Sequence, residues 1–242
     1  MDTVKAFLAE ASNRLANICD GQEEAFAAAL DTIISAIRSD GLVYIFGTGH
    51  SHMLAEEGHY RAGGLACVVP MLCSTVMLHE GAVAGSALER TPGLAEIVLS
   101  RYPVSAKDVL IVASTSGVNA VPVEAVRIGR QHGATVIALT SEAYSREAAR
   151  GRPRLADEAD IVLDNKAPPG DAVVDLDASG LRSGPVSTIV GAAILNALFS
   201  AAARRLAAED RNAPVYLSAN MEGAAEHNRI LVARYRARNP HL

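Results

Sequence analysis

Five short runs of almost wholly apolar residues constrain the fold of this chain more than any other feature. They are residues 42–46, 66–69, 109–113, 135–139 and 161–163. A strand with one face in water alternates apolar and polar residues, so uninterrupted runs predict strands that are buried on both faces. Because helical or polar segments separate the runs, the pattern predicts an α/β protein with a parallel sheet between two layers of helices.

Helical spacing of apolar residues surrounds these runs. It predicts helices over residues 2–18, 22–38, 120–132, 186–208 and about 221–238, with shorter helical pieces at 52–63, 77–83 and 94–100. The segment 165–185 is rich in glycine, proline and aspartate, and we expect a long loop there, of the kind that is often functional. No linker divides the chain. We therefore predict one domain over 1–242, with N-terminal helices at 1–39, a sheet core at 40–165 and C-terminal helices at 186–238.

Composition excludes several classes of protein. With 242 residues, 50% hydrophobic and 20% charged, the chain can bury a sizeable core. The net charge of −5, without a block of like charges, argues against nucleic acid as a partner and favours a small molecule. Three cysteines without a CxxC spacing argue against a disulfide framework and a cysteine zinc site. Because the N-terminus also lacks the apolar stretch of a signal peptide, we expect a cytoplasmic protein.

One segment is long enough to require a membrane test. Residues 186–203 read VSTIVGAAILNALFSAAA, about the length at which a spanning helix is considered. Ser187, Thr188, Asn196 and Ser200 interrupt the segment, and alanine is abundant in it. We interpret it as a helix of the core or of a subunit interface, and expect no contact with a membrane.

Two polar turns follow the first and third runs. The first comprises Gly47, Thr48, Gly49, His50 and Ser51, and the second is Ser-Thr-Ser-Gly-Val-Asn at 114–119, directly before a predicted helix. Ligands of parallel α/β sheets bind beyond the carboxyl ends of the strands, so both turns belong to the functional edge. Three hydroxyls, free amides and a helix N-terminus suit a phosphate or another anion, although a cap alone would need only one such residue. Neither turn fits the fingerprints for nucleoside triphosphates or dinucleotides.

The pair of turns resembles the two sugar-phosphate loops of the sugar isomerase (SIS) domain family. The similarity covers about residues 1–240 and is closest to a single-domain subgroup with phosphoheptose-isomerase-like and uncharacterised members, through GHSHMLAEE and NMEGAAEHN. It implies a three-layer sandwich around a five-stranded flavodoxin-like sheet, and a homodimer or homotetramer. It also implies that Ser114, Ser116 and Asn119, helped by Thr115, hold a phosphate, while Thr48 and Ser51 face a sugar.

Acid–base candidates lie in GHSHMLAEEGH and near the C-terminus. Isomerisation of an aldose to a ketose passes through an enediol and needs a base, often a carboxylate, and a group that opens the sugar ring, often histidine. Phosphoheptose isomerases carry an Ala-Glu-Glu that resembles residues 55–57, so the base is Glu56 or Glu57; a solvated helix surface is the rival interpretation. In related isomerases a residue from the C-terminal region reaches a neighbouring subunit's site, which makes His227 the candidate for ring opening.

Other polar residues are weaker candidates. His52, Glu56 and His59 share one side of a helix and could ligate zinc, but we expect no metal or other cofactor. His79 beside Glu80 is interpreted as structural. Ser183, like Ser187, lies at the entry to the apolar helix, where it is either a binding residue or a helix start signal.

The best interpretation is a phosphosugar aldose–ketose isomerase. A lyase or etherase acting on an amino-sugar phosphate would use the same phosphate turn and a glutamate base. A sensor would bind the phosphosugar without turnover, and a purely structural oligomer would leave the turn at 114–119 without a ligand.

Overall fold

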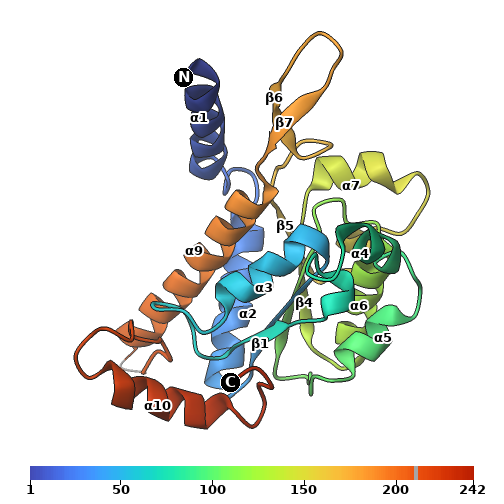
Figure 1. Cartoon of the computed structure of the whole chain (residues 1–242). Helices are drawn as coiled ribbons and strands as arrows, with labels where there is room; N and C mark the ends of the chain where they lie inside the picture. The colour runs from blue at the N-terminus through green and yellow to red at the C-terminus, as the bar shows by residue number, and fades with distance from the viewer. Residues whose placement is uncertain (210–211) are drawn as a thin grey trace.

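The computed structural model describes residues 1–209 and 212–242 (Figure 1). At its centre is a parallel sheet of five strands in the order β2-β1-β3-β4-β5. The strands are β1 (Val43–Gly47), β2 (Val68–Met71), β3 (Val109–Ala113), β4 (Thr135–Thr140) and β5 (Ile161–Asp164). Every residue of β1, β2 and β3 is buried, which confirms that the continuous apolar runs are strands covered on both faces.

The register of the two central strands positions the site. Val43 of β1 pairs with Val109 of β3, and Gly47 at the end of β1 pairs with Ala113 at the end of β3. The two strands therefore end at the same level of the sheet. The turns that follow them, at 48–51 and 114–119, leave the sheet side by side.

Helices from both ends of the chain cover one face of the sheet. They are α2 (Glu23–Arg38), α3 (Met53–Gly58) and α9 (Ser187–Ala208), and α9 packs against both others (Figure 1). Val190, Ile194 and Leu198 of α9 are buried in the core shared with α2.

The second face is covered by the middle of the chain. There α6 (Ala120–Gln131) contacts β1, β3 and β4, and α5 (Leu94–Leu99) and α8 (Leu155–Glu158) pack on α6. The remaining helices of this part are α4 (Ala82–Leu88), α7 (Glu142–Ala149) and the 3₁₀ helices η1 (Gly49–His52) and η2 (Ser74–Val76). Near the C-terminus, α10 (Ala224–Tyr235) follows α9.

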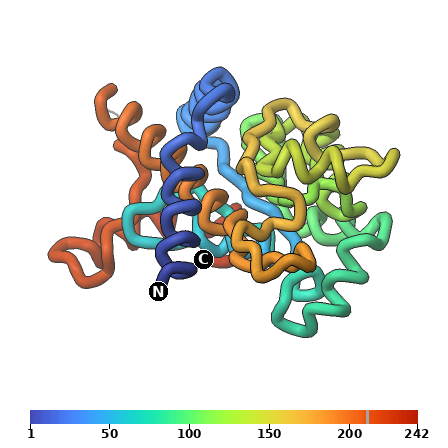
Figure 2. Tube along the Cα trace, turned by 90° about the horizontal axis from the view of Figure 1, so that it is seen from above, coloured from blue at the N-terminus to red at the C-terminus, as the bar shows by residue number. Residues whose placement is uncertain are grey.

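Two elements project from this body. Helix α1 (Asp2–Ala16) and the antiparallel hairpin of β6 (Ala172–Asp175) and β7 (Arg182–Pro185) stand beside each other beyond the N-terminal end of α9 (Figures 1 and 2). Helix α1 contacts only β6 and α9 among the elements with substantial contacts in the described chain, and Val4 and Leu8 on it are exposed.

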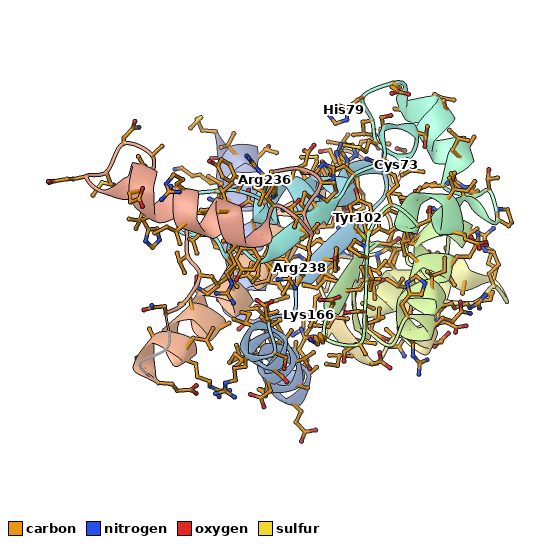
Figure 3. The ribbon with its side chains drawn as sticks, turned by 90° about the horizontal axis from the view of Figure 1, so that it is seen from below. Cys73, His79, Tyr102, Lys166, Arg236 and Arg238 are labelled. Carbon is orange, nitrogen blue, oxygen red and sulfur yellow. The ribbon has the colours of Figure 1, made fainter. Side chains whose placement is uncertain are left out.

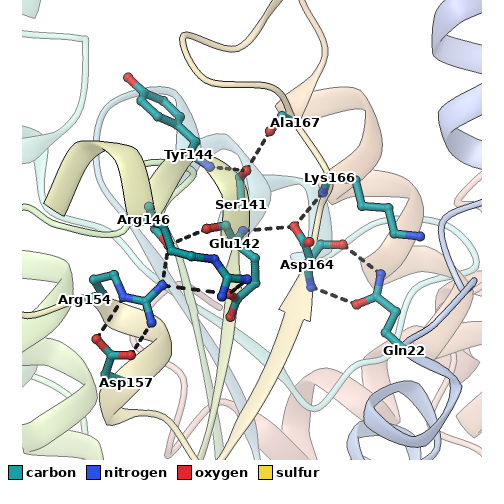
Figure 4. A network of polar contacts seen from close by, with 11 residues as sticks. Gln22, Ser141, Glu142, Tyr144, Arg146, Arg154, Asp157, Asp164, Lys166 and Ala167 are labelled. Atoms are coloured by element: carbon teal, nitrogen blue, oxygen red, sulfur yellow. Dashed lines mark hydrogen bonds and ion pairs between the residues drawn. The ribbon is translucent and has the colours of Figure 1, made fainter.

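Polar contacts join the base of α1 to the end of β5 (Figure 4). The Gln22 side chain accepts from the Asp164 amide at 2.9 Å and donates to the Asp164 carbonyl at 2.9 Å. The Asp164 carboxylate accepts from the amides of Glu142 and Lys166. Lys166 Nζ donates to the carbonyls of Asn17 and Asp20, so the segment leading to the hairpin is fixed to the N-terminal helices.

Three predictions for local structure need correction. The expected loop at 165–185 contains the β6–β7 hairpin, whose residues are mostly exposed and so leave no apolar run in the sequence. The helical piece expected at 77–83 is α4, which begins five residues later at Ala82, and the polar stretch before β5 contains α7 and α8. The last helix is shorter than expected and occupies 224–235.

Helix α9 is the one helix of the described residues that is long and apolar enough to cross a membrane. In the structure 44% of its most apolar window is buried inside the protein, and it packs on α1, α2 and α3. This packing agrees with its interpretation as a core helix. A cytoplasmic location stays a prediction.

Candidate functional site

The two polar turns line one cavity of about 360 Å³ at the carboxyl edge of the sheet. We call this cavity the strand-end pocket. Its wall includes residues from both predicted turns, namely Thr48, Gly49, His50, Ser51, Ser114, Thr115, Ser116 and Asn119. Residues that the sequence did not single out complete it, among them Met77, Leu78, Glu89, Arg90, Tyr144 and Asp171, together with Ser187. The structure therefore brings together the two turns that the sequence predicted to be neighbours.

The first turn depends on a glycine. A Cβ atom on Gly47 would lie 2.4 Å from the backbone carbonyl oxygen of Ser51. Because that neighbour is backbone, it cannot move aside as a flexible side chain could. Gly47 thus lets the chain leave β1 directly into η1, which places Thr48 and Ser51 on the pocket.

The second turn offers hydrogen-bond donors to the pocket. The Ser114 hydroxyl accepts from the Gly117 amide at 3.2 Å, so its proton is free to donate. Among the described residues, the amides of Thr115 and Ser116 have no acceptor. Helix α6 begins at Ala120, and its N-terminus adds a positive partial charge. We call residues 114–119 the anion turn, because these donors suit an anionic group.

A glutamate that the sequence did not indicate joins the two turns. Thr48 Oγ1 donates to Glu89 Oε2 at 2.6 Å, and Asn119 Nδ2 donates to Glu89 Oε1 at 2.8 Å. The guanidinium of Arg90 lies 3.5 Å from Glu89 Oε1. Glu89 comes directly after α4, in a segment whose sequence carries no recognisable motif. Only the folded chain shows that this carboxylate faces both turns.

An aspartate caps the helix at the far side of the pocket. Asp171 Oδ1 accepts from the Ser187 amide at 2.9 Å, and Asp171 Oδ2 accepts from the Ser187 hydroxyl at 2.6 Å. The N-terminus of α9 therefore also points to this pocket. Ser183, the predicted binding residue, is exposed on β7, where it pairs with Val174, and it is absent from the pocket wall. Its neighbour Ser187 takes that place.

The predicted catalytic residues lie outside the pocket wall of the single chain. Glu57 accepts from Asn196 Nδ2 at 3.0 Å and forms an ion pair with Arg61. His227 Nε2 lies 2.8 Å from the carbonyl oxygen of Val215. It faces a separate cavity of about 920 Å³ between α9 and α10, which we call the α9–α10 cavity.

Glu56 belongs to a group of potential metal ligands. Its Oε1 lies 3.3 Å from His52 Nε2, and one ligand atom each from His52, Glu56 and His79 lie within 4.8 Å of one another. The predicted third member, His59, is absent from this group. His59 Nε2 instead lies 3.4 Å from the carbonyl oxygen of His241, and burial lowers the pKa of His59.

His79, interpreted from the sequence as structural, takes the place of His59. It lies on the loop between η2 and α4, far in sequence from His52 (Figure 3). The rings of His52 and His79 meet edge to face, with their centroids 5.3 Å apart. A sequence pattern confined to one helix could not find this partner, because a different loop carries it.

Comparison with known proteins gives the same picture of the fold. The family model for the SIS domain matches residues 6–141. A UPF0309 protein of Brucella canis is 56% identical over 229 residues, which cover 95% of this chain and 94% of that protein. A UPF0309 protein of Brucella abortus strain S19 is 55% identical over the same length.

Solved structures share the fold at low sequence identity. The phosphoheptose isomerase of Francisella tularensis has a TM-score of 0.55 and 17% identity, over 83% of this chain and 96% of that chain. The phosphoheptose isomerase of Neisseria gonorrhoeae has a TM-score of 0.52 and 22% identity, over 83% of this chain and 97% of that chain.

Proposed function

Because the chain belongs to the SIS domain family, we propose that its strand-end pocket binds a sugar phosphate and that the protein is an aldose–ketose isomerase. The observation that carries the proposal is the meeting of both turns and the N-terminus of α6 around one cavity of about 360 Å³. A cavity of this size suits a small ligand. The solved phosphoheptose isomerases of the same fold are consistent with this ligand class.

The anion turn holds the phosphate in this proposal. The hydroxyls of Ser114 and Ser116 and the free amides of Thr115 and Ser116 donate to the phosphate oxygens. Arg90 on the pocket wall contributes a positive charge. The phosphate end of the substrate is thereby fixed, and the carbons of the sugar extend toward Thr48, Ser51 and Glu89.

Glu89 is our candidate for the carboxylate that moves the proton, in place of Glu57. It lies on the pocket wall, whereas Glu57 is engaged by Asn196 and Arg61. The donors Thr48 and Asn119 orient the Glu89 carboxylate. In an aldose–ketose reaction this carboxylate removes the proton from the carbon beside the carbonyl and returns it to the neighbouring carbon of the enediol. His50 is the histidine on the pocket wall and is available for ring opening.

Ligand binding is tested by thermal shift with sugar phosphates and with the same sugars lacking phosphate. We expect only the phosphorylated forms to raise the melting temperature of the wild type, and Ser116→Ala to reduce the rise. Ser183→Ala is the matched control, because Ser183 lies on the exposed face of the hairpin. The proposal fails if no sugar phosphate stabilises the wild type, or if Ser116→Ala responds as the wild type does.

The chemistry is tested by incorporation of solvent deuterium at C1 or C2 of the bound sugar phosphate. Glu89→Gln should abolish the incorporation, because an amide cannot accept the proton, while Glu57→Gln should leave it in place. The opposite result would return the role of base to Glu57. Glu56→Gln completes the series.

A phosphosugar sensor is the second candidate, and one observation favours it. Glu57 and His227, two of the predicted acid–base residues, are absent from the pocket wall of the chain. A sensor would show the thermal shift with phosphate dependence but no deuterium incorporation and no product. The pair of experiments therefore separates the two functions.

We also propose that the protein is a homodimer or homotetramer. The projecting α1 and hairpin expose the apolar side chains of Val4, Leu8, Leu176 and Leu181, each more than half accessible. Such side chains close together suit a subunit interface. Light scattering of the purified protein would give the number of subunits directly.

A further inference from the structure

The hydrogen bond of one buried histidine fixes which of its ring nitrogens carries a lone pair. His52 Nδ1 lies 2.8 Å from the carbonyl oxygen of Gly49. A carbonyl oxygen only accepts, so Nδ1 carries the proton and donates. In the neutral ring Nε2 then has a lone pair and no proton. This arrangement, in which one ring nitrogen donates to a backbone carbonyl, also orients histidine ligands in metal sites.

The second ring nitrogen of His52 is buried without a hydrogen-bond partner. The side chain is only 3% exposed, and Nε2 makes no hydrogen bond. Glu56 Oε1 lies 3.3 Å from it, within ion-pair distance, but the two atoms lack the geometry of a hydrogen bond. An imidazole lone pair therefore faces a carboxylate oxygen. Two acceptors at this distance repel each other unless a cation lies between them.

The distance between these atoms fits a tetrahedral metal ion. Zinc binds histidine nitrogen and carboxylate oxygen at about 2.0–2.1 Å, which places two tetrahedral ligand atoms about 3.3 Å apart. His52 and Glu56 are one helical turn apart, so backbone geometry sets their separation. The ring of His79, from the loop before α4, supplies the third ligand.

We propose that His52, Glu56 and His79 bind one Zn²⁺ ion per chain. Two neutral imidazoles and one carboxylate form a ligand set that zinc commonly accepts, and three protein ligands leave the fourth position open. Glu56 and His79 are exposed, so an ion can enter from solvent without rearrangement of the core.

The proposed zinc site lies beside the strand-end pocket. Ser51 and Leu78, which directly precede His52 and His79 in the chain, both line that pocket. The open position of the ion is thus near the place where the sugar would lie. The site stands on its own geometry and does not depend on the sugar-phosphate proposal.

Zinc binding is tested on the full chain, first stripped of metal. Zn²⁺ alone is added, excess is removed by gel filtration, and bound zinc is measured by mass spectrometry, with affinity from titration. We expect one zinc per wild-type chain. We expect His79→Ala to weaken binding by more than the roughly 10–100-fold that loss of an outer-shell partner costs. His79 is exposed, so this variant keeps the fold, which circular dichroism verifies.

Two matched pairs make the test specific. Glu56→Gln should lose zinc while Glu57→Gln keeps it, and His79→Ala should lose zinc while His59→Ala keeps it. Co²⁺ in place of zinc should give a visible spectrum without a thiolate band, because Cys73 and Cys19 are outside the ligand group. Ser116→Ala should bind zinc as the wild type does, which separates this site from the anion turn.

Three results would each overturn the proposal. They are the absence of stoichiometric zinc in the wild type, unchanged binding in both His79→Ala and Glu56→Gln, and a thiolate band in the cobalt spectrum.

Discussion

The strand-end pocket and the α9–α10 cavity differ in almost every property except that both are concave. The α9–α10 cavity is the larger, about 920 Å³ against about 360 Å³. Alanine, valine, isoleucine and leucine side chains dominate its wall, and its histidine, His227, already bonds to a backbone carbonyl. The wall of the strand-end pocket carries hydroxyls, amides, carboxylates and an arginine from five separate segments.

This difference shows that volume alone does not identify a binding site. Polar groups from strands distant in sequence meet at the strand-end pocket because β1 and β3 are adjacent and end in register. The α9–α10 cavity lies between two helices that follow each other in the chain, and few of its polar groups converge. Specific recognition of a small polar ligand needs convergent donors and acceptors.

Replacement of a single glycine should break the strand-end pocket with the largest effect. In Gly47→Ala the new Cβ would lie 2.4 Å from the Ser51 carbonyl oxygen, so the backbone of the turn must shift. We expect the free energy of unfolding to fall by about 3 kcal/mol, at the upper end of the usual range for overpacking. Urea denaturation measures the loss, and the thermal shift with sugar phosphate should disappear.

Gly223, at the start of α10, is the control on the other side of the comparison. It has a φ of 75°, but no atom lies within 4 Å of an added Cβ. Gly223→Ala should therefore cost about 1–2 kcal/mol, from backbone strain alone. It should retain the sugar-phosphate response. Equal losses in the two variants would show that the first turn tolerates a side chain.

Loss of the cap on α9 should have the next largest effect. Asp171→Ala removes the acceptor for the amides of Val186 and Ser187 and for the Ser187 hydroxyl. We expect the free energy of unfolding to fall by about 1–2 kcal/mol, as for other helix caps. Chemical denaturation gives the value. Ser183→Ala, on the exposed hairpin, should stay within about 0.5 kcal/mol of the wild type, and a similar loss there would contradict the assignment of the cap.

The regular part of this architecture was predictable because its signals are local. The runs at 42–46 and 109–113 are apolar because both faces of β1 and β3 are buried, and the turns after them carry the residues quoted for the family resemblance, which the SIS domain match confirms. The hairpin and α7 were missed for the opposite reason. Their residues are largely exposed, so burial imposes no periodic pattern on them.

The candidate site was predictable only in part. The turns at 48–51 and 114–119 were placed correctly, because strand ends share an edge in any parallel sheet. Glu89 and His79 lie in the segment between β2 and β3, where 3₁₀ turns and short helices leave no periodic signal. Their role depends on how this irregular segment folds back over the sheet edge, which a one-dimensional pattern does not specify.

Acid should distinguish the C-terminal end of the molecule from the strand-end pocket. Burial lowers the pKa of His59 and of His241 below the ordinary value of 6.5. The unfolded chain therefore takes up protons at a higher pH than the folded chain does. Stability contributed by the two neutral rings is present above about pH 6.5 and is lost as the pH falls from there toward the lowered pKa values.

The measurement is the melting temperature between about pH 7.5 and pH 5.5, where carboxylates contribute little. His241→Gln should flatten the decline, because it removes one of the two histidines while leaving a partner for Tyr102, whose hydroxyl lies 2.9 Å from His241 Nε2 (Figure 3). His132→Gln, on an exposed histidine, should decline as the wild type does. A wild-type slope in His241→Gln would show that His241 does not couple acid to stability.

The smallest effect should come from the histidine of the α9–α10 cavity. His227 is exposed, and its one hydrogen bond joins it to the Val215 carbonyl rather than to the strand-end pocket. His227→Asn should therefore change the free energy of unfolding by less than about 0.5 kcal/mol and leave the sugar-phosphate thermal shift intact. If ligand binding stays intact while deuterium incorporation falls, His227 must act on a pocket other than that of its own chain. Mixing His227→Asn with Glu89→Gln subunits would then restore activity, because each mixed assembly contains a pocket with an intact Glu89 and a neighbour with an intact His227.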